Sequence, residues 1–133
     1  MGNGGYTDDP TIPDEAELWR RIHPKQWDRD ENLGRVRPVS GAFDDPSDGS
    51  PMSVDLAEVH IQMGHGPEAA LASHEGFALA AITAGLAREC GLGVARQPLP
   101  ENPAHAVVFG KKTPKTRRRL AKEARWVVPP PDQ

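Results

Sequence analysis

The chain has 133 residues, of which 37% are hydrophobic and 5% aromatic, and its formal net charge is −3. That length predicts a single domain that buries a core without disulfides or metals, and the lone cysteine, Cys90, excludes an intramolecular disulfide and favours a reducing, cytoplasmic setting. No apolar run approaches the roughly 18 residues of a membrane-spanning helix, and the first residues lack the apolar stretch of a signal peptide, so we expect no membrane partner.

The first half of the chain is rich in turn-forming residues. Residues 1–13 offer little to bury and predict a disordered leader. The acidic start and apolar spacing of residues 14–23 favour a short helix ended by Pro24, with a strand over residues 18–23 as the alternative. Residues 24–52 carry many glycines and prolines and predict irregular structure, with an acidic surface loop over 44–51. Residues 52–57 alternate apolar and polar side chains, which predicts a strand.

The second half of the chain carries the stronger patterns. Pro67 and Gly76 bracket a predicted helix over residues 66–75. The most apolar run, residues 77–84, is short enough for a buried strand, followed by a helical turn at 86–90, whereas its alanine content also suits one helix running to Cys90. We favour the strand. Residues 94–99 and 104–109 predict two further strands, the first at an edge of the sheet.

The last element is a basic helix. Thr113 and Pro114 have the pattern of a helix start, residues 115–125 follow, and residues 126–128 predict a short docking strand. We therefore expect an α+β fold, with a small mixed sheet, two or three short helices, many loops and flexible termini. One domain would span residues 14–128, followed by a proline-rich tail at 129–133.

Charge is distributed unevenly along the chain. Residues 111–125 hold eight Lys/Arg and one acid, whereas the preceding 110 residues hold seventeen acids and eight bases. A concentrated positive segment attracts phosphates and acidic surfaces. The favoured function is therefore a small soluble binding or interaction module whose basic helix holds an acidic partner surface or a phosphate-containing ligand. The candidate ligand-binding residues are Arg20, Arg35, Arg37, Lys111, Lys112, Arg117, Arg118 and Arg119.

Two alternatives to that interpretation stay open. The arginines of the helix could pair with the acidic body of the same chain and bind nothing. Nucleic acid is a weaker candidate partner, because no aromatic residue lies among the basic residues to stack on bases.

The histidines do not follow a metal-binding pattern. His60, His65 and His74 are five and nine residues apart, which matches no standard zinc motif, and Cys90 has no second thiol beside it. The sequence therefore predicts no metal site and no cofactor.

A second functional hypothesis comes from polar residues near strand ends. Ser53 and Asp55 would project from one face of their strand, opposite Val54 and Leu56. His105, at the start of a later strand, could act as an acid or base, or could fix its turn by bonding a loop carbonyl. The alternative function is an enzyme that acts on a nucleotide-like ligand, with Arg20 or Arg35 holding charge. Its candidate catalytic residues are His23, Ser53, Asp55 and His105.

Two further interpretations of the same residues are a Ser-His-Asp hydrolase and a structural role. A Ser-His-Asp hydrolase fits poorly, because the chain has no Gly-x-Ser-x-Gly turn and Ser53 and Asp55 are neighbours on one strand. In a structural role, Asp55 would pair with Arg20 or Arg35.

One family resemblance accompanies the enzyme hypothesis. The order of residues 18–23, 34–37 and 52–57 resembles small ADP-ribosyltransferase-like domains, including some toxin domains, which have a strand bearing Arg or His, a Gly-Arg loop, and a strand with small hydroxyl residues. The matched segments cover a small part of the chain. The later acidic catalytic residue of that family has only Glu58 and Glu68 as candidate counterparts.

Overall fold

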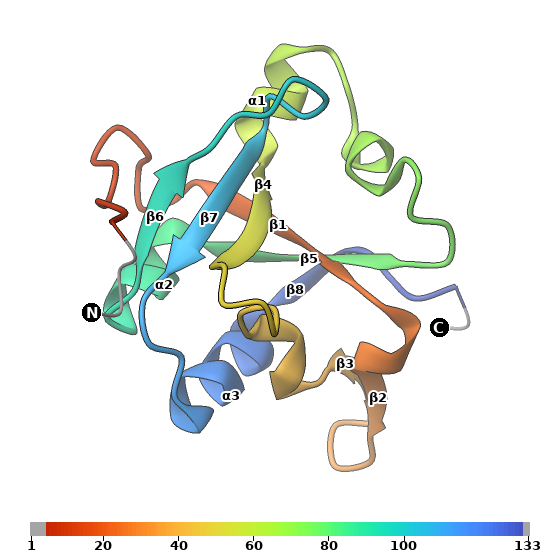
Figure 1. The fold of residues 1–133 in the computed structure, drawn as a ribbon. Helices are drawn as coiled ribbons and strands as arrows, with labels where there is room; N and C mark the ends of the chain where they lie inside the picture. Colours follow the sequence, from red (N-terminus) through yellow and green to blue (C-terminus); the bar gives the residue numbers. More distant parts are fainter. Residues whose placement is uncertain (1–4, 132–133) are drawn as a thin grey trace.

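The structure, a computed structural model, describes residues 5–131. Its centre is a six-stranded sheet with the strand order β6-β7-β4-β1-β5-β8, in which every neighbouring pair is antiparallel (Figure 1). Those strands are β1 (Glu17–Ile22), β4 (Met52–Leu56), β5 (Ala78–Thr83), β6 (Gly93–Arg96), β7 (His105–Phe109) and β8 (Arg125–Val128). A separate hairpin pairs β2 (Trp27–Asp30) with β3 (Arg35–Pro38).

Helices complete the α+β fold that the sequence predicts. The α-helices are α1 (Ala57–Gln62), α2 (Ala84–Glu89) and α3 (Pro114–Glu123), and three short 3-10 helices lie at Pro24–Gln26, Ser40–Phe43 and Pro67–Leu71. Figure 1 shows α3 beside the Ser40–Phe43 turn, whereas α1 lies at the other end of β4. The helices within residues 5–131 lack the length and apolar character needed to span a bilayer.

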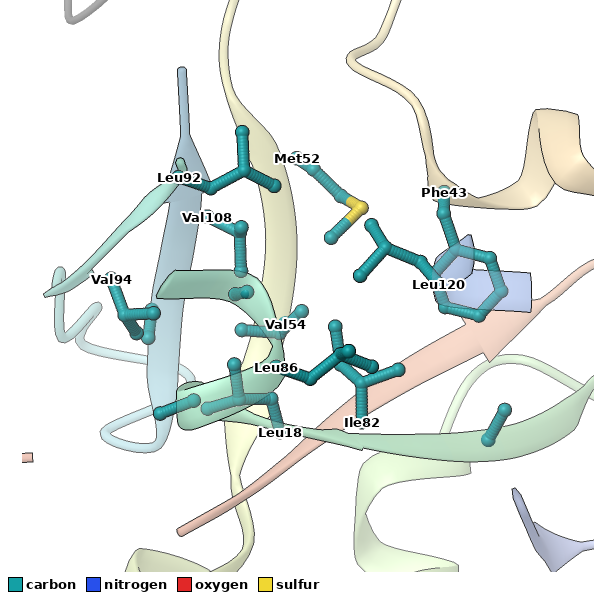
Figure 2. Close-up of a cluster of buried hydrophobic side chains, with 14 of the residues drawn as sticks. Leu18, Phe43, Met52, Val54, Ile82, Leu86, Leu92, Val94, Val108 and Leu120 are labelled. Carbon is teal, nitrogen blue, oxygen red and sulfur yellow. The ribbon is translucent and has the colours of Figure 1, made fainter. Parts of the chain in front are cut away.

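The two faces of the sheet have different characters. On one face, Leu18, Val54 and Val108 belong to the main hydrophobic core, together with residues of α2, α3 and the Ser40–Phe43 turn. Figure 2 shows Phe43, Met52 and Leu120 meeting there. Because side chains alternate along a strand, the residues between them point to the opposite face. That second face carries polar groups and smaller apolar clusters.

The first strand corrects the helix that the sequence favours over residues 14–23. Residues Glu17–Ile22 form β1, which lies between β4 and β5 and pairs with both. Ladder hydrogen bonds on two sides outweigh the helical preference of such a short run. The alternative, a strand over residues 18–23, is the confirmed one.

The segment predicted to be irregular contains the β2–β3 hairpin. At its tip, the Asp30 carboxylate accepts hydrogen bonds from the backbone N–H groups of Asn32 and Leu33. Gly34 has a positive φ of 65°, which glycine adopts without strain. Local hydrogen bonds to an aspartate thus stabilise the turn, and the glycine and proline content of the segment does not indicate them.

The open choice over residues 77–90 resolves as a strand followed by a helix. β5 ends at Thr83, whose hydroxyl accepts a hydrogen bond from Leu86 N and caps α2. The predicted helix over residues 66–75 is only the 3-10 helix Pro67–Leu71. The short helix α1, directly after β4, was not predicted.

Residues 5–13 pack on the body, whereas their composition predicts disorder. The Asp9 N–H donates to the Val94 carbonyl on the β6 edge, and Ile12 is fully buried. Arg88 donates to Asp8 and Asp14, and Tyr6 stacks on Phe109. A few specific contacts therefore hold a segment that has little apolar surface. Residues 1–4 of the predicted leader lie outside the described residues.

Candidate functional site

A cavity of about 680 Å³ opens over the polar face of the sheet, where α1, the Pro67–Leu71 helix and the start of β7 meet. Four of the five histidines of the chain line it. We call it the histidine cavity. The polar residues that line it are Arg21, Ser53, His60, His65, Ser73, His74, Glu101, Asn102 and His105.

Ser53 and His105 form a hydrogen-bonded pair in this cavity. The register of β4 and β7 places His105 opposite Asp55 and diagonal to Ser53. His105 Nδ1 lies 2.9 Å from the Gln97 carbonyl oxygen, which only accepts hydrogen bonds, so Nδ1 carries a proton. In the neutral ring, Nε2 then accepts a hydrogen bond from the Ser53 hydroxyl, and the distance from Nε2 to Ser53 Oγ is 3.1 Å. The ring is held by a loop carbonyl, as one interpretation of His105 predicts, and its other nitrogen faces the Ser53 hydroxyl.

The Asp55 carboxylate, near this pair, contacts three hydrogen-bond donors. Its side chain is only 1% exposed. Oδ2 lies 3.1 Å from Arg21 Nη2 and 2.8 Å from His60 Nε2, while Asn102 Nδ2 donates to Oδ1 at 3.0 Å. A buried carboxylate needs such compensation for the hydration it has lost. Asp55 therefore orients His60, and His105 is oriented by the Gln97 carbonyl instead.

The arginine of the cavity is Arg21, and the predicted candidate Arg20 lies on the opposite face. Arg20 donates to the carbonyls of Ala42 and Ser53, where it ties the core-side loop to β4. Burial, with the nearby charge of Arg21 as a smaller cause, lowers the pKa of Arg20 to about 10, so it stays charged at neutral pH. Arg21 instead donates from Nε to the Ala70 carbonyl and from Nη2 to Asp55.

Three other predicted residues lie away from the histidine cavity. His23 caps a 3-10 helix by accepting a hydrogen bond from Lys25 N, and its ring packs edge-on against Phe77. Arg37 pairs with Asp30 at 2.8 Å across the hairpin, and Arg35 is exposed beside it. The structure therefore brings Ser53, Asp55 and His105 together without His23, Arg20 or Arg35.

The basic segment, residues 111–125, is partly neutralised by the carboxylates of the same molecule. Four of its eight cations form ion pairs: Lys112 with Asp45, Arg117 with Asp44, Arg119 with Glu89 and Glu123, and Arg125 with Glu17. Among the described residues, no ion pair is formed by Lys111, Lys115, Arg118 or Lys122. The free positive surface is therefore smaller than the sequence predicts.

A second cavity lies beside α3 and mixes both signs of charge. It measures about 590 Å³, and its cations are Arg29, Arg37, Arg118 and Lys122. Asp28, Asp30 and Glu31 line the same cavity. Because this lining contains both cations and carboxylates, it is poorly suited to one strongly anionic ligand.

The candidate site residues chosen from the sequence leave out two central residues of the histidine cavity, His60 and Arg21. His60 reaches Asp55 because α1 begins directly after β4 and turns the chain back over the sheet. Arg21 shares a face with Trp19, which pairs with Asp55 across the ladder. A strand assignment for residues 17–22 would have placed Arg21 on that face, because side chains alternate along a strand.

The cavity does not form a ready metal centre. Within the described part of the chain, no group of three or more His, Cys, Asp or Glu side chains converges closely enough to hold a metal ion. His60 and His105 each have one ring nitrogen committed to a protein acceptor.

Comparison with known proteins finds no family model, curated protein or solved structure that matches this chain. The resemblance to ADP-ribosyltransferase-like domains therefore rests on the sequence segments alone. Of its two candidate acids, Glu58 has its Oε1 atom 3.5 Å from Arg96 Nη2, and Glu68 has its carboxylate beside Gly66. Neither lines the histidine cavity.

Proposed function

We propose that the protein is an enzyme that acts on a nucleotide-like anionic ligand in the histidine cavity, with Ser53 as nucleophile and His105 as its base. The observation that carries the proposal is the 3.1 Å contact between Ser53 Oγ and His105 Nε2, in a ring whose other nitrogen is fixed by Gln97. A nucleophile, a base within reach and a third group that orients the base are the features of activated-serine chemistry.

The proposed reaction is group transfer through Ser53. His105 takes the hydroxyl proton as Ser53 Oγ bonds to the electrophilic centre of the ligand, and the proton then passes to the departing oxygen. Water releases the bound group by the same route in reverse. Arg21, at the cavity wall, supplies positive charge for the anionic ligand and for charge that develops during transfer.

The basic segment gives less support to the partner-binding function. A docking surface needs cations that are free to meet a partner, and half of those in residues 111–125 already contact carboxylates of this chain. The histidine cavity instead gathers polar groups from four separate parts of the chain, so we place the function there.

The proposal is tested with an alkyl phosphonofluoridate probe, which reacts with activated serines as phosphorus bonds to oxygen and fluoride leaves. We expect mass spectrometry to locate the adduct on Ser53. His105→Gln should slow labelling by about a hundredfold or more, the usual contribution of a general base. Ser73→Ala is the matched control, because Ser73 lines the same cavity and should not affect labelling. An unchanged labelling rate in His105→Gln, or an adduct on a residue other than Ser53, would overturn the proposal.

A further inference from the structure

One ring nitrogen of His60 has no partner. Of the buried side-chain nitrogen and oxygen atoms in residues 5–131, His60 Nδ1 is the one that makes no hydrogen bond. Leaving a buried polar atom unpaired destabilises a fold, and folded proteins contain few such atoms. His60 is only 4% exposed and lines the histidine cavity. Because His60 is one of the lining residues, a ligand bound in the cavity is the partner that we consider for this atom.

The contact to Asp55 fixes the proton on the other nitrogen. His60 Nε2 lies 2.8 Å from Asp55 Oδ2, and an ionised carboxylate only accepts hydrogen bonds, so Nε2 carries a proton. Nδ1 therefore offers a lone pair in the neutral ring and an N–H group in the charged ring. In His105 the arrangement is reversed, with Nδ1 committed and Nε2 facing Ser53.

Arg21 provides a second free donor beside His60. Its Nη2 and the Nε2 of His60 both contact the same oxygen of Asp55, so the two side chains converge. Arg21 Nε is held by the Ala70 carbonyl, and Nη1 makes no hydrogen bond within the described residues. The Trp19 ring stacks on the His60 ring at a centroid distance of 5.6 Å and fixes its plane. Each of these two side chains thus has one nitrogen engaged at Asp55 and another nitrogen without a partner among the described residues.

We propose that His60 Nδ1 and Arg21 Nη1 bind the phosphate group of a phosphate monoester in the histidine cavity. This rests on the proposed function, because it names the anionic group of that same ligand. A phosphate monoester offers several acceptor oxygens and carries between one and two negative charges near neutral pH. It can therefore accept from Arg21 with one oxygen and share a proton with His60 Nδ1 at another.

The surrounding charges are compatible with an anion at this position. Asp55 is already compensated by Arg21 and His60. The His65 ring, from the loop after α1, lies 6.5 Å from the His60 ring, and His74 and His105 line the remaining walls. Glu101 is the one acidic side chain among the lining residues.

The test uses inorganic phosphate as the probe and follows the histidine ring nitrogens by ¹⁵N NMR. In the wild-type protein, we expect saturable shifts of the His60 Nδ1 resonance. His60→Gln keeps a side-chain amide that can donate to Asp55 but removes Nδ1, and it should weaken phosphate binding by about tenfold or more. His23→Gln is the matched control, because His23 is an exposed histidine outside the cavity, and its effect should be under about threefold.

The outcomes separate this inference from the proposed enzyme activity. Equal phosphate affinity in wild type and His60→Gln, or no saturable shift in wild type, overturns the phosphate site. If Ser53 still labels in that case, the proposed catalytic pair survives without it. Conversely, phosphate binding that depends on His60 in a protein whose Ser53 does not label supports the site and rejects the catalytic pair. Circular dichroism of His60→Gln verifies that the variant folds.

Discussion

Asp55 is the residue on which the histidine cavity depends most. Its buried carboxylate holds Arg21, His60 and Asn102, which come from a strand, a helix and a loop. A charge removed from water is tolerated only when several donors replace its hydration. The same carboxylate therefore stabilises the fold and sets the orientation of His60.

Replacing Asp55 by asparagine should destabilise the protein by about 2–3 kcal/mol, because the amide brings N–H groups towards donors that need an acceptor. Arg21 is 22% exposed, so water can compensate part of the loss. The free energy of unfolding from urea titration measures the effect. Glu31→Gln is the control, because its pair with Arg29 is exposed and should contribute under about 0.5 kcal/mol. Similar losses in both variants would show that Asp55 has no special role.

The residues of the site were predictable only where their strand was recognised. The alternating pattern over residues 52–57 is confirmed, with Val54 and Leu56 in the core and Ser53 and Asp55 on the polar face. Arg20 is the sequence-based candidate in place of Arg21, because the choice between adjacent arginines depends on strand phase, which a helix over β1 does not define. His60 was missed because α1 is too short for a periodic pattern to reveal.

At the scale of elements, the sequence predicts most strands but not their order. β4 and β7 are neighbours although 52 residues separate Ser53 from His105 along the chain. Local propensity and periodicity carry no information on which distant strands pair, so the sequence suggests a contact between these two residues without requiring it. The hairpin β2–β3 was missed for a different reason, because its two strands are short and largely exposed.

The pairing of β6 with β7 depends on a glycine beneath an aromatic ring. Gly93 is opposite Phe109 in the ladder, and a Cβ at residue 93 would lie 2.7 Å from Phe109 Cε2. The Phe109 ring is stacked on Tyr6 and only 4% exposed, so it has little room to move. Close approach of the ring to the backbone therefore requires glycine at this position.

Gly93→Ala should destabilise the protein by about 1–2 kcal/mol, because the added methyl group displaces the Phe109 ring from its packing. Thermal and urea unfolding would detect the loss. Gly41→Ala is the matched control, since a Cβ there meets no atom within 4 Å, and its change should stay within about 0.5 kcal/mol. A neutral Gly93→Ala variant would mean that the edge strand adapts without cost.

At the scale of the whole molecule, charges that are separate in the sequence come together in the fold. The acidic residues Asp44 and Asp45 lie at the start of the predicted acidic loop, and they pair with Arg117 and Lys112 of the basic segment. The electrostatic asymmetry read from the sequence is therefore partly an internal attraction between two segments. Sequence alone cannot distinguish this from a free docking surface, because both give the same charge distribution along the chain.

Adjacent lysines provide a direct test of that internal attraction. Lys112 Nζ lies 2.7 Å from Asp45 Oδ1 and donates to the Gly110 carbonyl, and its side chain is 1% exposed, whereas Lys111 is exposed. Lys112→Ala should therefore cost about 2 kcal/mol, since it removes a packed stem and the ammonium group that pairs with Asp45, and Lys111→Ala should cost under about 0.5 kcal/mol.

A third variant separates charge from packing at the same position. Lys112→Met keeps most of the apolar stem and loses the ammonium group, so it should retain part of the destabilisation measured for Lys112→Ala by urea unfolding. If Lys112→Met is as stable as wild type, the stem alone anchors the segment and the ion pair contributes nothing. If Lys112→Ala and Lys111→Ala lower the free energy of unfolding equally, the pair between Lys112 and Asp45 contributes nothing beyond the general positive charge of the basic segment.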